Sequence, residues 1–262
     1  MPESSVESIL LEIVTDFYTT FGLEPVSVRY VIAEDMGEAY SDLRPDYISQ
    51  HPELAANAQK YNGITVLPDS LDGEFTVLLN GVILQQSVVD GNANWIGTIA
   101  HETTHAVDYT EYADLVWVDS YDELQLIDKH AMFQLWTEVN ARAKGYYFVR
   151  KYTFEDMTDE RQVSDILNIE LPGQYNLLFQ NYNATRDGYQ QAYLVAQYLG
   201  RLYTLQQLFP KTFTNKFIRQ HLSTNKWMYD WFVFYSKYNT LSEAYEHFDE
   251  MKNILRQNFR GL

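Results

Sequence analysis

The sequence predicts an α+β protein in which a small, mostly antiparallel sheet packs on one long helix and a helical half follows. Three observations lead to this prediction. Before residue 90, short segments in which apolar and polar residues alternate are separated by turn residues. Near residues 94–112, two histidines share one face of a helical pattern. After that, apolar residues recur mostly at helical spacing. We assign residues 1–152 to a core domain and residues 153–262 to a helical C-terminal subdomain packed on it.

The N-terminal part is predicted to contain one helix, one strand and a polar segment. Apolar residues at helical spacing between positions 9 and 21 predict the first helix, with Ser4 or Ser5 at its start and Gly22 at its end. Residues 26–32 alternate as a strand does, and the polar residues 34–60 predict a loop with one or two short helices.

A small antiparallel set of strands is predicted next, at residues 64–67, 74–79 and 82–86. Asp72–Gly73 and Asn80–Gly81 have the composition of hairpin turns between them. In this order the last strand would form the rim of a cleft, to which an extended peptide can add as a further strand.

The run His101-Glu102-Thr103-Thr104-His105 carries the clearest chemical signal. On a helix, four residues advance about 400°, so the two imidazoles project from one face a single turn apart. This is the HExxH pattern, in which two histidines bind zinc and the glutamate takes a proton from the attacking water. The alternative is a surface helix with two solvated histidines.

The residues around this motif predict an amphipathic helix. Polar or small residues share the face of the two histidines, and apolar residues form the opposite face. Asn92 or Asn94 can cap the start of the helix. We therefore expect the histidines to line a cleft and not the apolar core.

A third zinc ligand is expected from the next long helix, predicted to run from Ser120 to about residue 152. Glu138 lies in an apolar stripe of that helix, and an ionised carboxylate there needs a partner, which a metal ion would supply. The competing explanation is an ion pair with Arg142, four residues later. Asp108 shares the histidine face, but it lies about 10.5 Å from His101 along the helix, so we expect it to line the cleft or support a ligand.

The C-terminal half is predicted to be helical throughout. Its expected helices start near Thr158, occupy residues 187–208, 216–222 and 226–238, and end with one capped by Thr240. Aromatic residues are dense in this half, and we expect them to be mainly core.

Composition excludes several classes of protein. The 262 residues are 46% hydrophobic, enough for a substantial core. A formal net charge of −17 repels phosphate backbones, so we expect no nucleic-acid partner. Because the chain has no cysteine, any metal site must use histidine and carboxylate ligands. The sequence shows neither a signal peptide nor a stretch long enough to span a membrane, so we expect a cytoplasmic protein without a membrane partner.

With His101-Glu102-x-x-His105 on one helix and Glu138 on the next long one, the chain resembles the gluzincin branch of zinc metallopeptidases. It looks most like compact bacterial and phage-type members, over roughly residues 64–150. The resemblance implies a zincin-like core, Zn²⁺ held by His101, His105 and Glu138, and Glu102 as general base. One departure is Arg142, which stands where some gluzincins place an acid.

Two functions follow as hypotheses. The first is a zinc-dependent metallopeptidase, a hydrolase that cleaves a peptide or protein substrate with a metal-activated water. The alternative is a non-catalytic binding or regulatory protein on a metallopeptidase scaffold. A third possibility is that the helix binds no metal. The sequence does not specify an oligomeric state.

Overall fold

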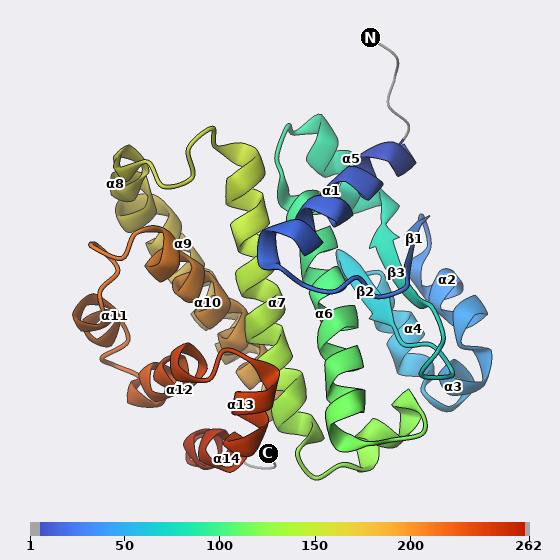
Figure 1. Ribbon diagram of the computed structural model, residues 1–262. Coiled ribbons are helices and arrows are strands. Elements are labelled where there is room, and N and C mark those ends of the chain that lie inside the picture. The colour runs from blue at the N-terminus through green and yellow to red at the C-terminus, as the bar shows by residue number, and fades with distance from the viewer. Residues whose placement is uncertain (1–5, 260–262) are drawn as a thin grey trace. The chain divides into compact units, whose positions relative to one another are not determined.

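The computed structural model describes residues 6–259, without the side chains of the first two of these (Figure 1). The predicted start of the first helix at Ser4 or Ser5 lies outside this range. The chain forms two compact units, Met1–Leu124 with Phe148–Thr153, and Gln125–Tyr147 with Phe154–Leu262.

The first unit contains a three-stranded sheet with the order β1-β3-β2. The strands are β1 (Val28–Ala33), β2 (Gly63–Val66) and β3 (Phe75–Asn80). β2 pairs antiparallel with β3 as predicted, whereas β1 pairs parallel with β3. Every residue of β3 is buried, which is typical of a central strand covered on both faces. The mixed α+β class is confirmed, but the sheet is mixed and not mostly antiparallel.

The predicted strand at residues 82–86 is wrong, because α5 (Gly81–Val89) occupies this segment. Asn80 is the N-cap of α5, and its side chain accepts a hydrogen bond of 3.3 Å from the backbone N of Ile83. Asparagine favours helix caps as well as hairpin turns, so the Asn-Gly pair alone did not distinguish them. The predicted hairpin and the cleft-rim strand after it are therefore also wrong.

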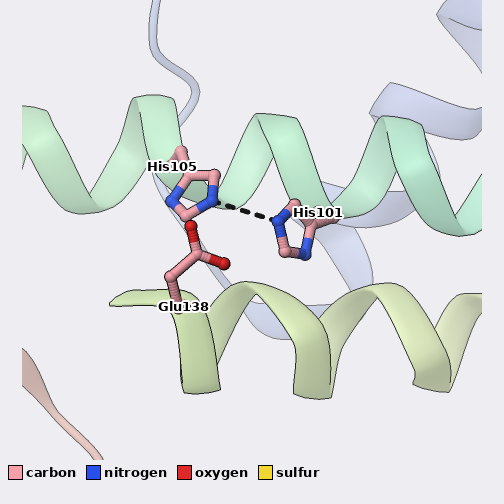
Figure 2. A group of neighbouring side chains, drawn as sticks. All are labelled: His101, His105 and Glu138. Carbon is pink, nitrogen blue, oxygen red and sulfur yellow. Dashed lines mark hydrogen bonds between the residues drawn. The ribbon is translucent and has the colours of Figure 1, made fainter. Parts of the chain in front are cut away.

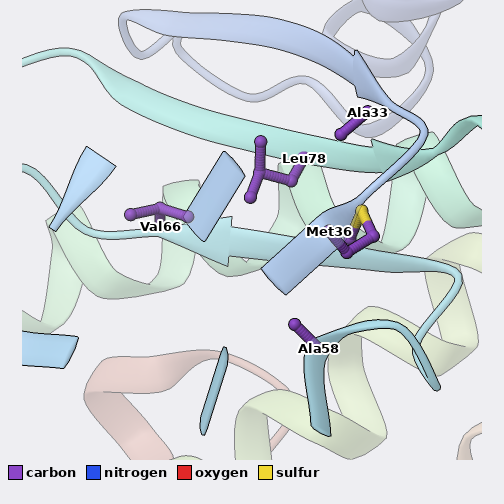
Figure 3. Close-up of a cluster of buried hydrophobic side chains, with 5 residues drawn as sticks. All are labelled: Ala33, Met36, Ala58, Val66 and Leu78. Atoms are coloured by element: carbon purple, nitrogen blue, oxygen red, sulfur yellow. The ribbon is translucent and has the colours of Figure 1, made fainter. Parts of the chain in front are cut away.

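Three short helices fill the segment predicted as loop with one or two helices: α2 (Met36–Leu43), α3 (Pro45–Gln50) and α4 (Pro52–Ala58). A cluster of buried side chains joins α2 and α4 to the sheet, and Figure 3 shows its members: Ala33, Met36, Ala58, Val66 and Leu78. Removal of this apolar surface from water stabilises the packing of the short helices on the sheet.

Two longer helices complete the first unit, α1 (Val6–Phe21) and α6 (Asn94–Val116). α6 contacts α1 as well as β2 and β3 (Figure 1). The predicted cap of α6 by Asn92 or Asn94 is wrong, because the N-cap residue is Ala93 and makes no side-chain capping hydrogen bond. Asn92, one residue before the cap, accepts a hydrogen bond of 3.1 Å from the backbone N of Asn94. Trp117 is the C-cap residue that follows α6; it is a non-glycine residue with φ of 58°, and 92% of it is exposed.

The helix that carries Glu138 begins later than predicted. It is α7 (His130–Thr153), and residues before it form the 3₁₀ helix η1 (Tyr121–Leu126). Near the predicted start at Ser120, Glu123 accepts a hydrogen bond of 3.2 Å from the backbone N of Asp119. The predicted domain boundary after residue 152 falls at the end of α7.

The second unit is helical, as predicted for this part of the chain. After short turns of helix, η2 (Glu160–Gln162), α8 (Val163–Asp165) and η3 (Ile166–Glu170), it contains α9 (Leu171–Ala184), α10 (Gly188–Leu208), α11 (Asn215–His221), α12 (Lys226–Lys237), α13 (Leu241–Glu246) and α14 (Phe248–Arg256). The expectation that aromatic residues form much of the core is confirmed in α12, where Trp231, Phe232, Phe234 and Tyr235 are buried.

Gly200 allows α10 to approach α7 closely. A Cβ at this position would lie 2.5 Å from the carbonyl oxygen of Val139 and 2.9 Å from the backbone N of Ala143. One turn later, the hydroxyl of Thr204 donates a hydrogen bond of 2.8 Å to the carbonyl oxygen of Ala143. The close approach needs a residue without a side chain, and it brings the polar residues of the two facing helices together.

No helix within residues 6–259 is both long enough and apolar enough to cross a membrane.

Candidate metal centre

α6 places the two histidines of the motif as the spacing predicts. His101 and His105 lie one turn apart, and their Nε2 atoms are 3.1 Å from each other (Figure 2). Two nitrogen ligands of one tetrahedral zinc ion, each with a Zn–N bond of roughly 2.0–2.1 Å, lie about 3.3 Å from each other. The pair therefore has the spacing that one shared ion requires.

Both histidines are buried, with 8% of each residue exposed. The interpretation of α6 as a surface helix with two solvated histidines is therefore wrong. The prediction of a polar, open histidine face also needs correction, because Thr104 and Asp108 on that face are buried. The hydroxyl of Thr104 donates a hydrogen bond of 2.7 Å to the carbonyl oxygen of Ala100, which satisfies this polar group inside the protein.

Glu102, the predicted general base, lies against the outer strand of the sheet. The hydroxyl of Thr65 on β2 is 2.9 Å from Oε2 of Glu102 and 2.8 Å from its carbonyl oxygen. A Cβ at Gly63 would lie 2.8 Å from Cγ of Glu102, so the strand approaches the helix where it has no side chain. Sequence analysis missed Thr65, because its contact depends on the packing of β2 on α6.

Glu138 joins the two histidines in a group that could hold a metal ion. His101, His105 and Glu138 each offer one ligand atom, and these atoms lie within 4.8 Å of one another (Figure 2). The three residues are those predicted as ligands from the sequence. Two imidazoles and one carboxylate are a donor set found in catalytic zinc sites, which keep a fourth position for water.

The side chain of Glu138 is held by a neutral partner. The amide of Gln197 on α10 donates a hydrogen bond to Oε2 of Glu138. Arg142 donates through Nε to the amide oxygen of Gln197. Among residues 6–259, Arg142 forms no ion pair with Glu138, so the competing explanation of Glu138 from the sequence is not supported.

Gln197 was not identified from the sequence, and no local signal marks it. It is separated from Glu138 by 59 positions in the chain, and only the packing of α10 on α7 brings the two side chains together.

Comparisons with protein families, with curated proteins and with solved structures found no match for this chain. The resemblance to gluzincins therefore rests on the residues of the motif and on the group that they form.

Proposed function

We propose that the protein is a zinc-dependent metallopeptidase with a zincin-like core. The observation that carries the proposal is the gathering of His101, His105 and Glu138 into one group of possible ligands. Glu102, the residue after the first histidine, supplies the carboxylate that hydrolysis requires. The 3.1 Å spacing of the two imidazole nitrogens supports a shared ion.

When bound at such a site, zinc lowers the pKa of a water molecule and polarises a carbonyl group. Glu102 accepts a proton from the attacking water and passes it to the leaving amine. The hydroxyl of Thr65 shares its one proton between this carboxylate and the carbonyl oxygen of Glu102, and it holds the carboxylate beside β2. His101, His105 and Glu138 hold the ion and make no proton transfer.

An extended peptide is the substrate that the surroundings of Glu102 favour. β2 is an outer strand of the described sheet, paired on one side with β3. A peptide that adds to the other side of β2 forms backbone hydrogen bonds and runs past the side of α6 that carries Glu102.

A non-catalytic binding or regulatory role is the second candidate, and one observation favours it. Only 6% of Glu102 and 8% of each histidine is exposed. A metal held by such buried residues can be structural, without a position open to substrate.

Metal content and peptide cleavage, measured on the same preparations, test the proposal. We expect one zinc ion per chain in the wild type, and its loss in His101→Ala and Glu138→Gln, whereas the control His51→Ala, a half-exposed histidine outside the group, keeps it. Glu102→Gln should keep zinc and lose cleavage of a diverse peptide library.

Zinc at one ion per chain without cleavage by the wild type would favour the binding role. A wild type that binds no zinc, or a Glu102→Gln variant with full activity, would overturn the peptidase.

A further inference from the structure

Two arginines follow the proposed zinc ligand and its partner Gln197 by one helical turn each. Arg142 follows Glu138 by one turn on α7, and Arg201 follows Gln197 by one turn on α10. The close packing of the two helices at Gly200 brings these turns together, and both arginines are partly buried.

Neither guanidinium has a carboxylate partner among the described residues. Arg142 uses Nε for the amide oxygen of Gln197. The Nε of Arg201 is buried and has no hydrogen-bond partner in residues 6–259, and its guanidinium lies 6.0 Å from the ring centroid of Tyr146. A guanidinium against an aromatic ring keeps its charge and its outer donors.

The surroundings of Arg201 disfavour its positive charge. Burial, with the positive charge of Arg142 added, lowers the pKa of Arg201 to about 10. Glu170 is the acid that opposes this effect, but its carboxylate accepts hydrogen bonds from the hydroxyl of Tyr146 and the amide of Gln174. Because the chain has 36 acidic and 19 basic residues, two adjacent arginines without a carboxylate partner are unexpected.

We propose that Arg142 and Arg201 form a binding site for a carboxylate of the peptide substrate. This inference rests on the proposed peptidase function. A carboxylate fits the geometry of guanidinium groups, which can each bind both of its oxygens. It also adds negative charge beside two guanidinium groups that form no ion pair within residues 6–259.

The position of the site limits which carboxylate it can take. One helical turn, about 5.4 Å, separates Arg142 from Glu138 along α7. An extended peptide advances about 3.3 Å per residue, so the bound carboxylate belongs to a residue within about two positions of the bond that is cleaved. It is either the C-terminal carboxylate or an Asp or Glu side chain.

Three peptides distinguish these sources: N-acetyl-Ala-Ala-Ala with a free C-terminus, the same peptide with a C-terminal amide, and N-acetyl-Ala-Ala-Asp amide. Dissociation constants are measured by calorimetry on the full chain, with zinc and without it. We expect at least one peptide that carries a carboxylate to bind about tenfold more tightly than the neutral amide. A preference for the free C-terminus indicates a carboxypeptidase, and one for the Asp peptide indicates an acidic side chain.

Arg142→Gln and Arg201→Gln should each reduce this preference to about twofold or less. Arg219→Gln, which removes a positive charge from an exposed position of α11, should keep the wild-type preference. Binding is measured separately from cleavage. A wild type that takes up no zinc or cleaves no peptide, but still prefers carboxylates, would count against the peptidase and leave the anion site standing. Equal binding of all three peptides by the wild type, or binding of none, would overturn the anion site.

Thermal unfolding separates a ligand-binding role from a structural one. Removal of a partly buried charge should leave the melting temperature of Arg201→Gln unchanged or higher, as is common for residues kept for function. Arg201→Lys retains a charge and should keep part of the preference. A melting temperature several degrees lower, with the carboxylate preference intact, would assign Arg201 to the structure.

Discussion

Gln197 donates a hydrogen bond to Glu138 and accepts one from Arg142, so a neutral amide separates a carboxylate from a guanidinium. A direct ion pair would neutralise Glu138 within the protein. With the amide between them, Arg142 makes no ion pair with Glu138, and the hydrogen bond from Gln197 orients one carboxylate oxygen. This is the kind of support that ligands of catalytic metals usually have.

Gln197→Leu should weaken zinc binding about tenfold, because partners of this kind contribute roughly 10- to 100-fold to metal affinity. The measurement is a competition titration with a chelator of known affinity. Gln190→Leu, at an exposed position of the same helix, is the matched control and should bind zinc like the wild type. Equal affinity in both variants would show that Gln197 does not position Glu138.

Thr65→Val removes the hydroxyl that donates to Glu102 and keeps the shape of the side chain. A hydrogen bond to a charged group contributes roughly 1.5–3 kcal/mol, so we expect kcat/KM for peptide cleavage to fall at least about tenfold. The zinc dissociation constant should stay the same, because Thr65 contacts no proposed ligand. Parallel losses of zinc and activity would contradict this role.

Among individual residues, the sequence predicted His101, His105 and Glu138 as a group. Helix periodicity places the two histidines on one face, and the apolar residues around Glu138 mark it as the third member. It did not predict Thr65 or Gln197. Their roles depend on which strand and which helix pack against α6 and α7, and side-chain periodicity within one element carries no such information.

Among the elements, α7 and α10 depend on one residue for their close approach. Gly200→Ala should lower the free energy of unfolding by about 2 kcal/mol, because the new Cβ would lie 2.5–2.9 Å from backbone atoms of α7. Gly173→Ala on α9 is the matched control, since a Cβ there meets nothing within 4 Å. Alanine has the better helix propensity, so the control should gain up to about 1 kcal/mol.

Urea denaturation of the two variants measures the difference. A stabilised Gly200→Ala variant would mean that α10 shifts away from α7 at little cost.

Prediction of the helices and strands failed where one residue type is common in two local structures, as asparagine is in hairpin turns and in helix caps. Asn80 was taken for a hairpin residue, but it caps α5, and its buried amide group also donates hydrogen bonds of 3.2 Å to the carbonyl oxygens of Gln59 and Tyr61. The parallel pairing of β1 was also missed, since alternation within a strand does not reveal the direction of its neighbour. The start of α10 was predicted well, because the side chain of Asp187 accepts a hydrogen bond from the backbone N of Gln190, three residues later.

For the whole molecule, acid should reduce stability in part through His130. Burial lowers the pKa of this histidine to about 4, against 6.5 for the unfolded chain. Between these two values the unfolded state binds a proton that the folded state does not, so stability falls as the pH falls from 6.5 towards 4. We expect a loss of about 1 kcal/mol at pH 5, after allowance for the partial exposure of the ring.

The test compares urea midpoints of the wild type and His130→Gln at pH 7.5 and pH 5. The variant should lose less stability in acid than the wild type, whereas His51→Gln should follow the wild type. Identical acid sensitivity in all three proteins would exclude His130 as a source of the effect.

Trp117, where α6 ends, provides an optical probe of the helix that carries both histidines. Of the tryptophans, Trp136 and Trp231 are buried, whereas Trp117 is almost fully open to water. Its fluorescence should be red-shifted and readily quenched by iodide, whereas that of Trp136 and Trp231 should be shielded from the quencher.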